Sequence, residues 1–195
     1  MRALVVYCHP IEGSFSSVLR DAAVSGLRRA GHSVDIIDLS ADSFNPVMRE
    51  DEWLSYMAKN PVPPPDVAKY VELVQHAEIM VFVYPTWWSS VPAQLKGWAD
   101  RVFRPGVAFT LNKRNRVRPA LKNLRRIITV TTFGSPWMYV KAMNDNGSRI
   151  FIRSLRLSCV HRVRTLRLSY YRMDRSTPES RAAFLSRVEK KMAQL

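Results

Sequence analysis

The sequence predicts one α/β domain over residues 1–195, with a parallel sheet covered by helices on both faces. Two observations indicate this class. Short apolar runs typical of buried strands alternate along the chain with segments of helical periodicity, which is the pattern of consecutive βαβ units. The length of 195 residues, of which 47% are hydrophobic and 24% charged, is ordinary for one globular domain with a complete core.

The chain is expected to start with a strand, a helix and a second strand. Leu4–Tyr7 is a continuous apolar run, as in a strand that is buried on both faces. A helix begins at Ser14–Ser17 and ends at Gly31, a residue that suits a helix C-terminus. Val34–Leu39 alternates polar and apolar residues and predicts a more exposed strand.

A long excursion over residues 40–65 separates these elements from the rest of the sheet. It contains a short predicted helix with Trp53, Tyr56 and Met57. It ends in the proline-rich stretch 61–65, which cannot continue a helix or donate the hydrogen bonds of a sheet.

The remaining elements continue the alternation. Asp66 is the expected N-cap of a helix that runs to about His76, and Pro92 is expected in the first turn of another. Ile79–Tyr84 gives the strongest buried-strand pattern in the chain. The later elements are strands at Ile127–Thr132 and about 162–170, a helical region within 138–157 and a helix after Pro178.

Positive charge is concentrated in the second half of the chain. Thirty Lys and Arg against sixteen Asp and Glu give a net charge of +14. Sixteen of the basic residues but only two acidic ones, Asp145 and Asp174, lie between Leu111 and Arg175, so this segment carries the whole excess. It predicts a basic face toward an anionic surface or partner or, alternatively, a solvated face that keeps the protein soluble.

The sequence gives no sign of export or of metal binding. Met1–Cys8 has only a short apolar stretch without a clear cleavage site, so it predicts a strand rather than a signal peptide. No apolar run approaches the roughly 20 residues of a membrane span. Cys8 and Cys159 are too few and too far apart for a disulfide framework or a zinc site. We therefore expect a cytoplasmic protein without a metal, whose basic segment leaves peripheral attachment to a membrane open.

Three loops should meet at one edge of the sheet. In a parallel sheet, ligands bind at the carboxyl ends of the strands, where the strand order reverses. The loops after the first, third and fourth strands, residues 8–17, 85–91 and 131–139, all end there. Each is rich in hydroxyl, aromatic or small residues, which suits a ligand site.

The first loop is a candidate anion seat. It lacks the Gly-Lys-Ser/Thr ending of a nucleotide phosphate loop and the spaced glycines of a dinucleotide site. Hydroxyls and free backbone N–H groups at a helix N-terminus still suit an anion, with Ser14 and Ser16 as ligands and His9 as a donor. The alternative is that Ser14 only caps the helix and His9 only satisfies a backbone carbonyl.

The other two loops combine aromatic and small residues. The adjacent Trp87 and Trp88 suit a flat heteroaromatic ligand, although one of them could instead pack beneath the following helix. In the third loop, Gly134 permits close approach of a ligand to the backbone. Tyr139 could place its phenol near a substrate carbonyl or, alternatively, be a half-buried residue at a helix start.

A long segment without gaps resembles a known family. Tyr84–Phe103, with the sequence YPTWWSSVPAQLKGWADRVF, and its continuation Gly106–Phe109 are similar to the flavodoxin-like NAD(P)H:quinone oxidoreductases. These include DT-diaphorase and bacterial relatives, among them ancillary proteins of potassium-efflux systems. The His-Pro…Ser-Phe-Ser loop before the segment and the Thr-Thr-x-Gly-Ser…Met-Tyr loop after it occur in the family's order. The resemblance covers about residues 2–140 and implies a flavodoxin-like fold, with a five-stranded parallel sheet of strand order 2-1-3-4-5.

The resemblance also implies roles for single residues. The residues that would hold the phosphate portion of a flavin are His9, Ser14, Phe15 and Ser16. Those that would border its isoalloxazine ring are Pro85, Thr86, Trp87 and Trp88 on one side and Thr131, Thr132, Phe133 and Gly134 on the other. Tyr139 matches a tyrosine that faces the substrate and helps to balance charge during hydride transfer. The family's histidine six residues further on is Asp145 here, which argues against a Tyr/His proton relay.

The implied activity is a two-step hydride transfer. NAD(P)H reduces a bound FAD or FMN and leaves, and a quinone-like acceptor takes its place, while the protein supplies positioning and electrostatics. The resemblance implies a homodimer as well. It does not decide whether the flavin is FAD or FMN, or whether the electron donor is NADH or NADPH.

Two other classes of function compete with this one. A flavin-binding regulatory subunit docked on a membrane transporter is motivated by the basic segment, in which Arg149, Arg153 and Arg156 share one helical face. Nucleic-acid binding has the charge in its favour but no recognisable helix-turn-helix, zinc or RNA-binding motif, so we do not expect it.

Overall fold

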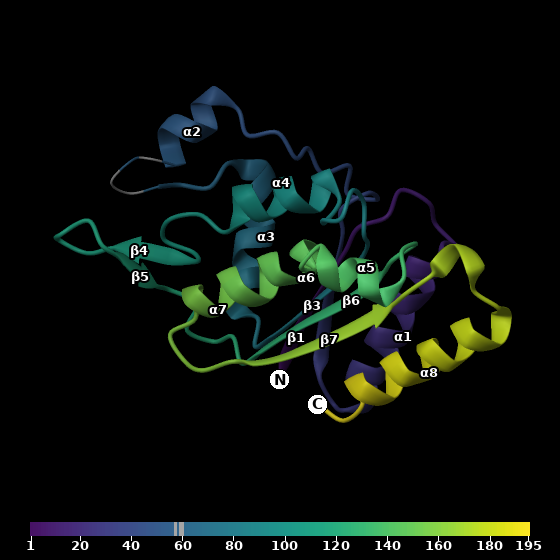
Figure 1. The fold of residues 1–195 in the computed structure, drawn as a ribbon. Helices are drawn as coiled ribbons and strands as arrows, with labels where there is room; N and C mark the ends of the chain where they lie inside the picture. Colours follow the sequence, from purple (N-terminus) through teal and green to yellow (C-terminus); the bar gives the residue numbers. More distant parts are fainter. Residues whose placement is uncertain (57, 59–60) are drawn as a thin grey trace.

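The sheet has five parallel strands in the order β2-β1-β3-β6-β7 (Figure 1). The computed structural model describes residues 1–56, 58 and 61–195. The strands of the sheet are β1 (Arg2–Tyr7), β2 (Ser33–Asp38), β3 (Ile79–Pro85), β6 (Arg126–Thr132) and β7 (Arg164–Tyr170). These are the five strands expected from the sequence, and the predicted order 2-1-3-4-5 is confirmed. The order reverses between β1 and β3, so the carboxyl ends of these strands flank the usual ligand crevice.

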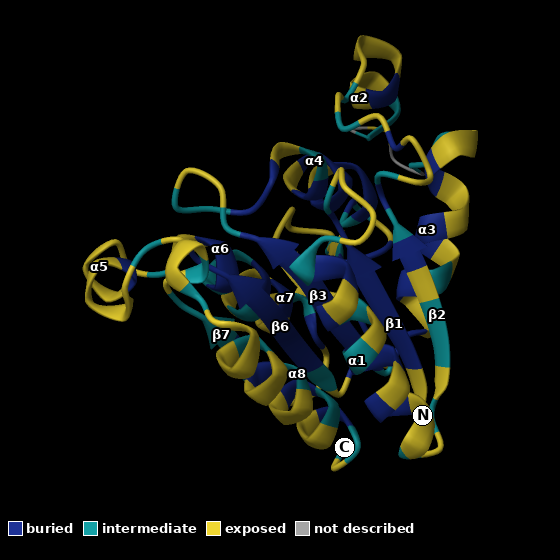
Figure 2. Ribbon diagram, turned by 90° about the vertical axis from the view of Figure 1, so that its right-hand side faces the viewer, coloured by how far each residue is buried: buried dark blue, intermediate teal, exposed yellow. Residues whose placement is uncertain are grey.

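Helices cover both faces of the sheet. Neighbouring residues of a strand point to opposite faces, so that Leu4 and Val6 of β1 belong to one core and Ala3 and Val5 to the other. Figure 2 shows α1 and α8 side by side over the second core. The first core is closed by α3, α4 and the helical segment after β6. The bounds of these four helices are Phe15–Arg29 for α1, Pro178–Met192 for α8, Pro65–His76 for α3 and Ala93–Val102 for α4.

The first helix starts and ends as its sequence predicts. The side chain of Ser14 caps α1 and accepts a hydrogen bond from the backbone N–H of Ser17 at 3.2 Å. At the other end Gly31 has a φ of +77°, and its N–H donates to Arg28 O at 2.9 Å. This left-handed conformation favours glycine, because other residues would be strained there.

Two other predicted helix starts are displaced. Asp66 is not an N-cap, because α3 begins at Pro65 and is preceded by Pro64 as its cap. Proline suits the first helical position, since its missing N–H would have no intrahelical partner there. Asp66 instead accepts a hydrogen bond from Arg101 Nη2 at 2.8 Å. Pro92 caps α4 from the residue before its first turn.

The chain between β3 and β7 contains elements that the sequence did not predict. After α4 the chain forms a two-stranded antiparallel hairpin, β4–β5, which projects from the body of the domain (Figure 1). The predicted helical region within 138–157 is divided into four segments, of which η1 is a π-helical turn. The bounds are β4 (Phe109–Leu111), β5 (Val117–Pro119), α5 (Trp137–Ala142), α6 (Asn146–Arg149), η1 (Ile150–Ser154) and α7 (Leu155–Ser158).

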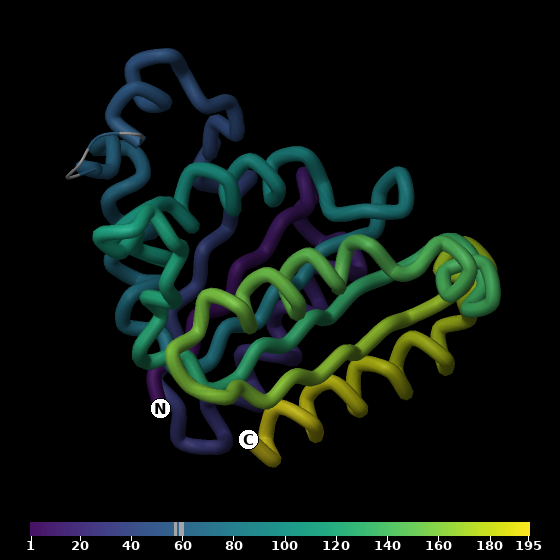
Figure 3. Tube along the Cα trace, turned by 60° about the vertical axis from the view of Figure 1, so that its left-hand side comes forward, coloured from purple at the N-terminus to yellow at the C-terminus, as the bar shows by residue number. Residues whose placement is uncertain are grey.

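Loops from distant parts of the chain meet at one end of the sheet. Figure 3 shows the chain around α5 beside the chain that joins β7 to α8. This second segment contains the short 3₁₀ helix η2 (Met173–Arg175). The two are tied by backbone hydrogen bonds from Arg172 N to Ser135 O at 3.2 Å and from Met173 N to Phe133 O at 2.9 Å. Among the described residues, no helix combines the length and the apolar character needed to cross a membrane.

The helix of the excursion, α2 (Glu50–Tyr56), is attached to α4 by buried charges. Glu52 is 2% exposed and accepts a hydrogen bond from Arg101 Nε at 2.8 Å. The guanidinium of Arg104 is also buried and lies 3.8 Å from the second oxygen of Glu52. The predicted short helix is thus confirmed through Tyr56, and Met57 lies outside the described residues.

Candidate functional site

The three predicted loops follow adjacent strands of the sheet and meet at their carboxyl ends. The backbone N–H of Cys8 donates to Val83 O at 3.1 Å, and that of Thr86 donates to Thr132 O at 2.9 Å. The second and third loops border an open pocket of about 470 Å³, which residues of the following chain and of η2 complete. Its lining residues are Thr86, Trp88, Ser89, Phe133, Gly134, Ser135, Tyr139, Val140, Met143, Asp145 and Asp174.

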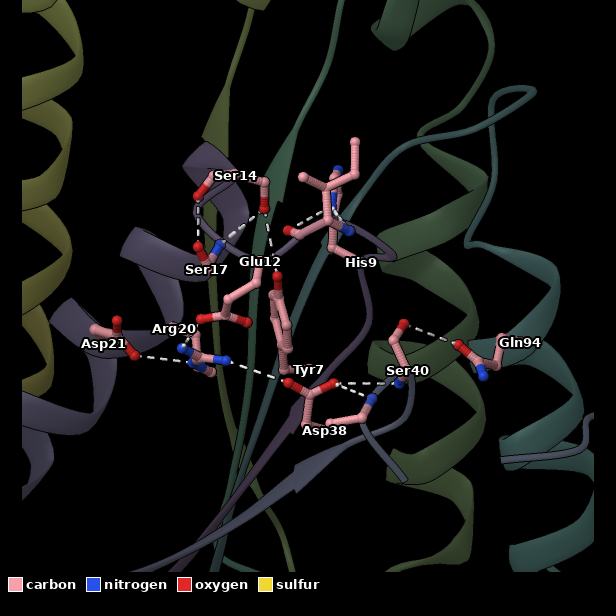
Figure 4. A network of polar contacts seen from close by, with 12 residues as sticks. Tyr7, His9, Glu12, Ser14, Ser17, Arg20, Asp21, Asp38, Ser40 and Gln94 are labelled. Atoms are coloured by element: carbon pink, nitrogen blue, oxygen red, sulfur yellow. Dashed lines mark hydrogen bonds and ion pairs between the residues drawn. The ribbon is translucent and has the colours of Figure 1, made fainter. Parts of the chain in front are cut away.

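The first loop is ordered by hydrogen bonds within the protein (Figure 4). Ser14 Oγ lies 3.3 Å from the Tyr7 hydroxyl and also accepts from Ser17 N, while Ser17 Oγ donates to Ser14 O at 2.7 Å. The ring nitrogen Nδ1 of His9 accepts a hydrogen bond from Ile11 N at 3.1 Å. Ser14 therefore caps the helix, as the alternative for it expected, whereas His9 accepts from a backbone N–H rather than satisfying a carbonyl. When Nδ1 accepts, Nε2 is the ring nitrogen that carries the proton.

The positive charge next to the first loop is already neutralised. Figure 4 shows the Arg20 guanidinium among three carboxylates, with distances of 2.8 Å to Asp21, 3.2 Å to Asp38 and 3.3 Å to Glu12. The same guanidinium lies 4.8 Å from the centre of the Tyr7 ring. An anion in this loop would therefore rely on hydroxyls and on the backbone N–H groups at the start of α1, rather than on a free cation.

The cysteine that begins the first loop has a packing role. Cys8 is buried, and its thiol lies 3.7 Å from Gln94 Oε1, a distance within the range for a weak hydrogen bond from sulfur. Burial raises the pKa of the Cys8 thiol to about 11. It therefore stays protonated at neutral pH and is not a nucleophile.

The second loop is a tight turn that presents its tryptophans to solvent. Trp87 N donates to Ser90 O at 3.1 Å, and Ser90 N donates to Trp87 O at 2.9 Å. At the tip, Trp88 and Ser89 have φ angles of 47° and 57°, in the left-handed region that costs energy for residues with a side chain. Trp88 is 100% exposed and Trp87 is 46% exposed, so neither packs beneath the helix. Trp88 lines the pocket, whereas the Trp87 ring lies 6.4 Å from that of His9 in the first loop.

The third loop brings an aromatic side chain and a glycine to the pocket. Phe133 is buried and stacks on Tyr171, with ring centres 5.2 Å apart. Gly134 is the position at which Asp174 approaches the backbone, because a Cβ there would lie 2.6 Å from Asp174 Oδ2. Tyr139 is half exposed on the pocket wall, where its phenol can reach a ligand.

The structure divides the predicted site residues into three groups. Those that line the pocket are Thr86, Trp88, Phe133, Gly134 and Tyr139. Those of the first loop lie at the start of α1 or beside the second loop and are His9, Ser14, Phe15 and Ser16. The others lie at strand ends or outside the pocket lining and are Pro85, Trp87, Thr131 and Thr132.

The sequence missed several residues of the pocket. Ser89 and Ser135 neighbour predicted residues, and Val140 and Met143 follow Tyr139 on and after α5. Asp174 comes from the chain after β7 and is brought in only by the tertiary fold. Its one sequence signal is that it is one of two acidic residues in the basic segment.

Comparisons with known proteins give a consistent result. The family model of the flavodoxin-like fold matches residues 1–193. A NAD(P)H dehydrogenase (quinone) 1 of Cavia porcellus is 32% identical over 153 residues, which cover 71% of this chain and 55% of the relative. A ribosyldihydronicotinamide dehydrogenase (quinone) of Homo sapiens is 30% identical over 182 residues, which cover 82% of this chain and 75% of the relative.

A solved structure extends this similarity to the fold. The NAD(P)H:quinone oxidoreductase from Methanothermobacter marburgensis has a TM-score of 0.81 at 24% identity, with 100% of this chain and 95% of that chain covered. At this level of identity the likeness concerns the fold alone. The match to the Cavia porcellus relative spans just over half of that protein's length.

Proposed function

The chain belongs to the flavodoxin-like family that includes the NAD(P)H:quinone oxidoreductases, and on this premise we propose that it is a flavin-dependent enzyme that transfers a hydride from NAD(P)H to a quinone-like acceptor. The observation that carries the proposal is the pocket of about 470 Å³ between the second and third loops. Small-molecule and cofactor sites typically have volumes of roughly 300–1,000 Å³. The pocket also lies at the carboxyl ends of β3 and β6, the end of a parallel sheet at which ligands bind, and next to the point between β1 and β3 where the strand order reverses.

The residues of the pocket fit a flavin ring. Trp88 and Phe133 provide aromatic surfaces for a flat heteroaromatic system. The hydroxyl of Thr86 is buried and has no hydrogen-bond partner within the described part of the chain. A buried polar group without a partner is costly, so a ligand that bonds to it gains that energy. A flavin ring carries donors and acceptors along one edge and can satisfy such a group.

The first loop fits the phosphate portion of the cofactor. In the described residues, the backbone N–H groups of Phe15 and Ser16 have no acceptor, as is normal at the start of a helix. The positive end of the helix dipole favours an anion at this point. Gly13 directs the chain into the helix with a φ of +79°, which glycine adopts without strain. Ser14 keeps its hydroxyl proton while it caps the helix, so its capping role does not prevent it from binding an anion.

The chain's own residues would position the reactants and move a proton. A bound flavin would supply the centre that accepts a hydride and passes it on. The flat rings of nicotinamide and quinone would reach it past Trp88, whose exposed side chain stands at the pocket edge. Tyr139 would donate a hydrogen bond or a proton to the oxygen of the acceptor. Asp145 accepts a hydrogen bond from Arg167 Nη1, so we assign the donor role on this wall to Tyr139.

Reconstitution tests the proposal directly. The purified protein is incubated with FAD or FMN, desalted and examined by absorption and tryptophan fluorescence, and then supplied with NADH or NADPH and a quinone. We expect one flavin per chain, quenched tryptophan fluorescence and quinone-dependent oxidation of the nucleotide. Loss of both flavins on desalting, together with unquenched fluorescence, would contradict the proposal.

The expected homodimer belongs to the same proposal. Its test is the molar mass of the flavin-loaded protein measured by size-exclusion chromatography with light scattering. A mass of twice 22.4 kDa is expected, and a mass of one chain at every concentration would contradict it.

A further inference from the structure

The two acidic residues of the basic segment share one location. Between Leu111 and Arg175 the chain has sixteen basic residues and two acidic ones, Asp145 and Asp174. Both acidic residues line the pocket, and no Lys or Arg among the described residues lines it. A segment with a large excess of positive charge thus places both of its negative charges where a ligand would meet them.

Asp145 lines the pocket and has one carboxylate oxygen without a partner among the described residues. Its side chain is 10% exposed, and its Oδ2 accepts a hydrogen bond from Arg167 Nη1 at 2.8 Å. Its Oδ1 is buried and has no partner in the described part of the chain. Arg167 pairs with the other oxygen of this carboxylate and does not line the pocket. A buried carboxylate oxygen without a donor is expensive, and a ligand that donates a hydrogen bond or carries a positive charge would remove that cost.

The backbone holds Asp145 in this position at a further cost. Asn144 and Asp145 have φ angles of 64° and 44°, two successive residues in the left-handed region. The backbone N–H of Asp145 donates to Val140 O at 3.0 Å, which closes the turn after α5. Strain of this kind persists where the surroundings enforce it, and it concentrates at ligand sites. Asp and Asn tolerate this conformation better than most residues.

Asp174 approaches the pocket from a different element. It lies in η2 and is exposed, so its carboxylate stands at the mouth of the pocket rather than at its base. Its carboxylate lies against the backbone of Gly134, where a Cβ would be 2.6 Å from Asp174 Oδ2. Arg172 and Arg175 flank Asp174 along the chain, but neither lines the pocket.

Aromatic rings complete a lining that favours cations. Trp88, Phe133 and Tyr139 belong to the same pocket as the two carboxylates. The face of an aromatic ring attracts a positive charge, and tryptophan does so most strongly. Trp88 is fully exposed on a strained turn, which leaves its ring available to a ligand. Carboxylates and aromatic faces together are the lining expected for an aromatic cation.

We infer that this pocket selects acceptors that carry a positive charge or an N–H donor and discriminates against anionic ones. The inference rests on the proposed function and deepens it by naming the substrate class. The net charge of +14 acts in the opposite direction, because it draws anions toward the protein as a whole. Selectivity for cations must therefore arise within the pocket, at short range.

Matched acceptors provide the test. Three 1,4-naphthoquinones carry a quaternary ammonium, a hydroxyl or a sulfonate group on the same short tether, and kcat/KM is measured for each with the flavin-loaded protein. We expect the cationic quinone to exceed the sulfonate by about tenfold, the order of one additional favourable charge interaction. A second readout is the dissociation constant of three non-reducible naphthalenes with the same substituents, from quenching of tryptophan fluorescence. High salt screens the outer surface more than the pocket, so the preference should survive it.

The decisive variants are Asp145→Asn, Asp174→Asn and the double variant. Asparagine keeps the size of the side chain and tolerates the backbone at position 145, so the fold is preserved. The control is Asp100→Asn, an exposed carboxylate on α4 that pairs with Lys96 at 2.6 Å and does not line the pocket. The double variant should lose the preference in both turnover and binding, and the control should keep it.

The outcomes separate the inference from the proposed function. Equal treatment of the three substituents by the wild type, or a preference that persists in the double variant, overturns the inference. Absence of turnover with every quinone contradicts the proposed function instead, and in that case the order of the three binding constants still decides the inference.

Discussion

Most of the described charged residues before Leu111 form ion pairs, whereas those between Leu111 and Arg175 are largely unpaired. Within the described residues there are twelve ion pairs, and ten of them join two residues that precede Leu111. A single pair, Arg167 with Asp145, joins two residues of the later segment. The cause is the shortage of carboxylates there, since two acidic residues face sixteen basic ones. Charge thus stabilises the fold in the first region and is available to ligands or partners in the second.

The largest effect is expected where the charges of the first region are buried. Glu52→Gln would remove the negative charge that faces both Arg101 and Arg104, which are 1% and 0% exposed. Burial already lowers the pKa of the Arg104 guanidinium, and Glu52 opposes this shift. An uncompensated buried charge costs several kcal/mol, so we expect a loss of about 3 kcal/mol in the free energy of unfolding.

Urea unfolding measures this loss. The matched control is Asp51→Asn, the neighbouring residue on α2, whose exposed carboxylate pairs, within the described part of the chain, only with Arg49. This variant should unfold at the wild-type midpoint. If Glu52→Gln behaved like the control, the buried group would not hold α2 in place, and the contrast between the two regions would fail.

The next effect concerns turnover at the pocket. Tyr139→Phe removes the one phenol that lines the pocket and leaves the ring in place. Loss of a positioned proton donor typically costs on the order of 100-fold in rate. We expect flavin binding to be unchanged and quinone turnover to fall by about that factor, measured as kcat with the flavin-loaded protein. Turnover at the wild-type rate would make Tyr139 a structural residue.

A smaller effect on binding is expected at Trp88, which is exposed, has a left-handed backbone and lines the pocket. Trp88→Ala should weaken flavin or acceptor binding about tenfold, of the order of one lost aromatic contact. Trp88→Gly should show the same loss but be more stable to unfolding than Trp88→Ala by about 1 kcal/mol, since glycine adopts the φ of 47° without strain. Trp53→Ala, at a half-exposed tryptophan on α2, is the control and should leave binding unchanged. Equal stability of the two Trp88 variants would show that the turn is not strained.

The fold was predictable where local sequence and tertiary environment agree. Leu4–Tyr7 and Ile79–Tyr84 are strands that are buried on both faces. Their sequences are therefore continuously apolar, and this pattern predicts them. The hairpin β4–β5 has strands of three residues, mostly exposed, that are joined by a turn with Lys113, Arg114 and Arg116, so no apolar pattern marks it. Asp66 has the sequence signature of an N-cap, but Pro65 starts the helix and Arg101 takes the carboxylate, a contact over 35 positions.

The site was predictable loop by loop but not as a complete pocket. Loops at the ends of β3 and β6 follow from the order of elements, which is why Trp88 and Tyr139 could be named in advance. Asp174 lines the pocket next to Gly134, which lies 40 positions earlier in the chain. Glu52 is one of three consecutive acidic residues at the start of α2, a pattern typical of an exposed helix start. It is buried because it pairs with Arg101 and Arg104, which lie far away in the sequence. Such contacts between residues far apart in the sequence produce no periodic pattern from which they could be predicted.

The smallest effect on the fold is expected in the basic segment. None of Arg149, Arg153 and Arg156 forms an ion pair among the described residues, so changing all three to Gln should alter the free energy of unfolding by less than about 0.5 kcal/mol.

If this face meets an anionic membrane surface, the same variant should bind phosphatidylserine vesicles several-fold more weakly in co-sedimentation. Binding of the wild type should fall steeply with salt, because exposed charges are screened within about 10 Å at 0.1 M. A matched control changes Arg187, Lys190 and Lys191 of α8 to Gln, which removes the same charge from exposed positions outside the segment. Weaker binding in the first variant alone would assign a partner surface to the basic segment. Equal losses in both variants, or equal binding to duplex DNA, would reduce the interaction to net charge, and no binding at low salt would leave the segment as a solubilising face.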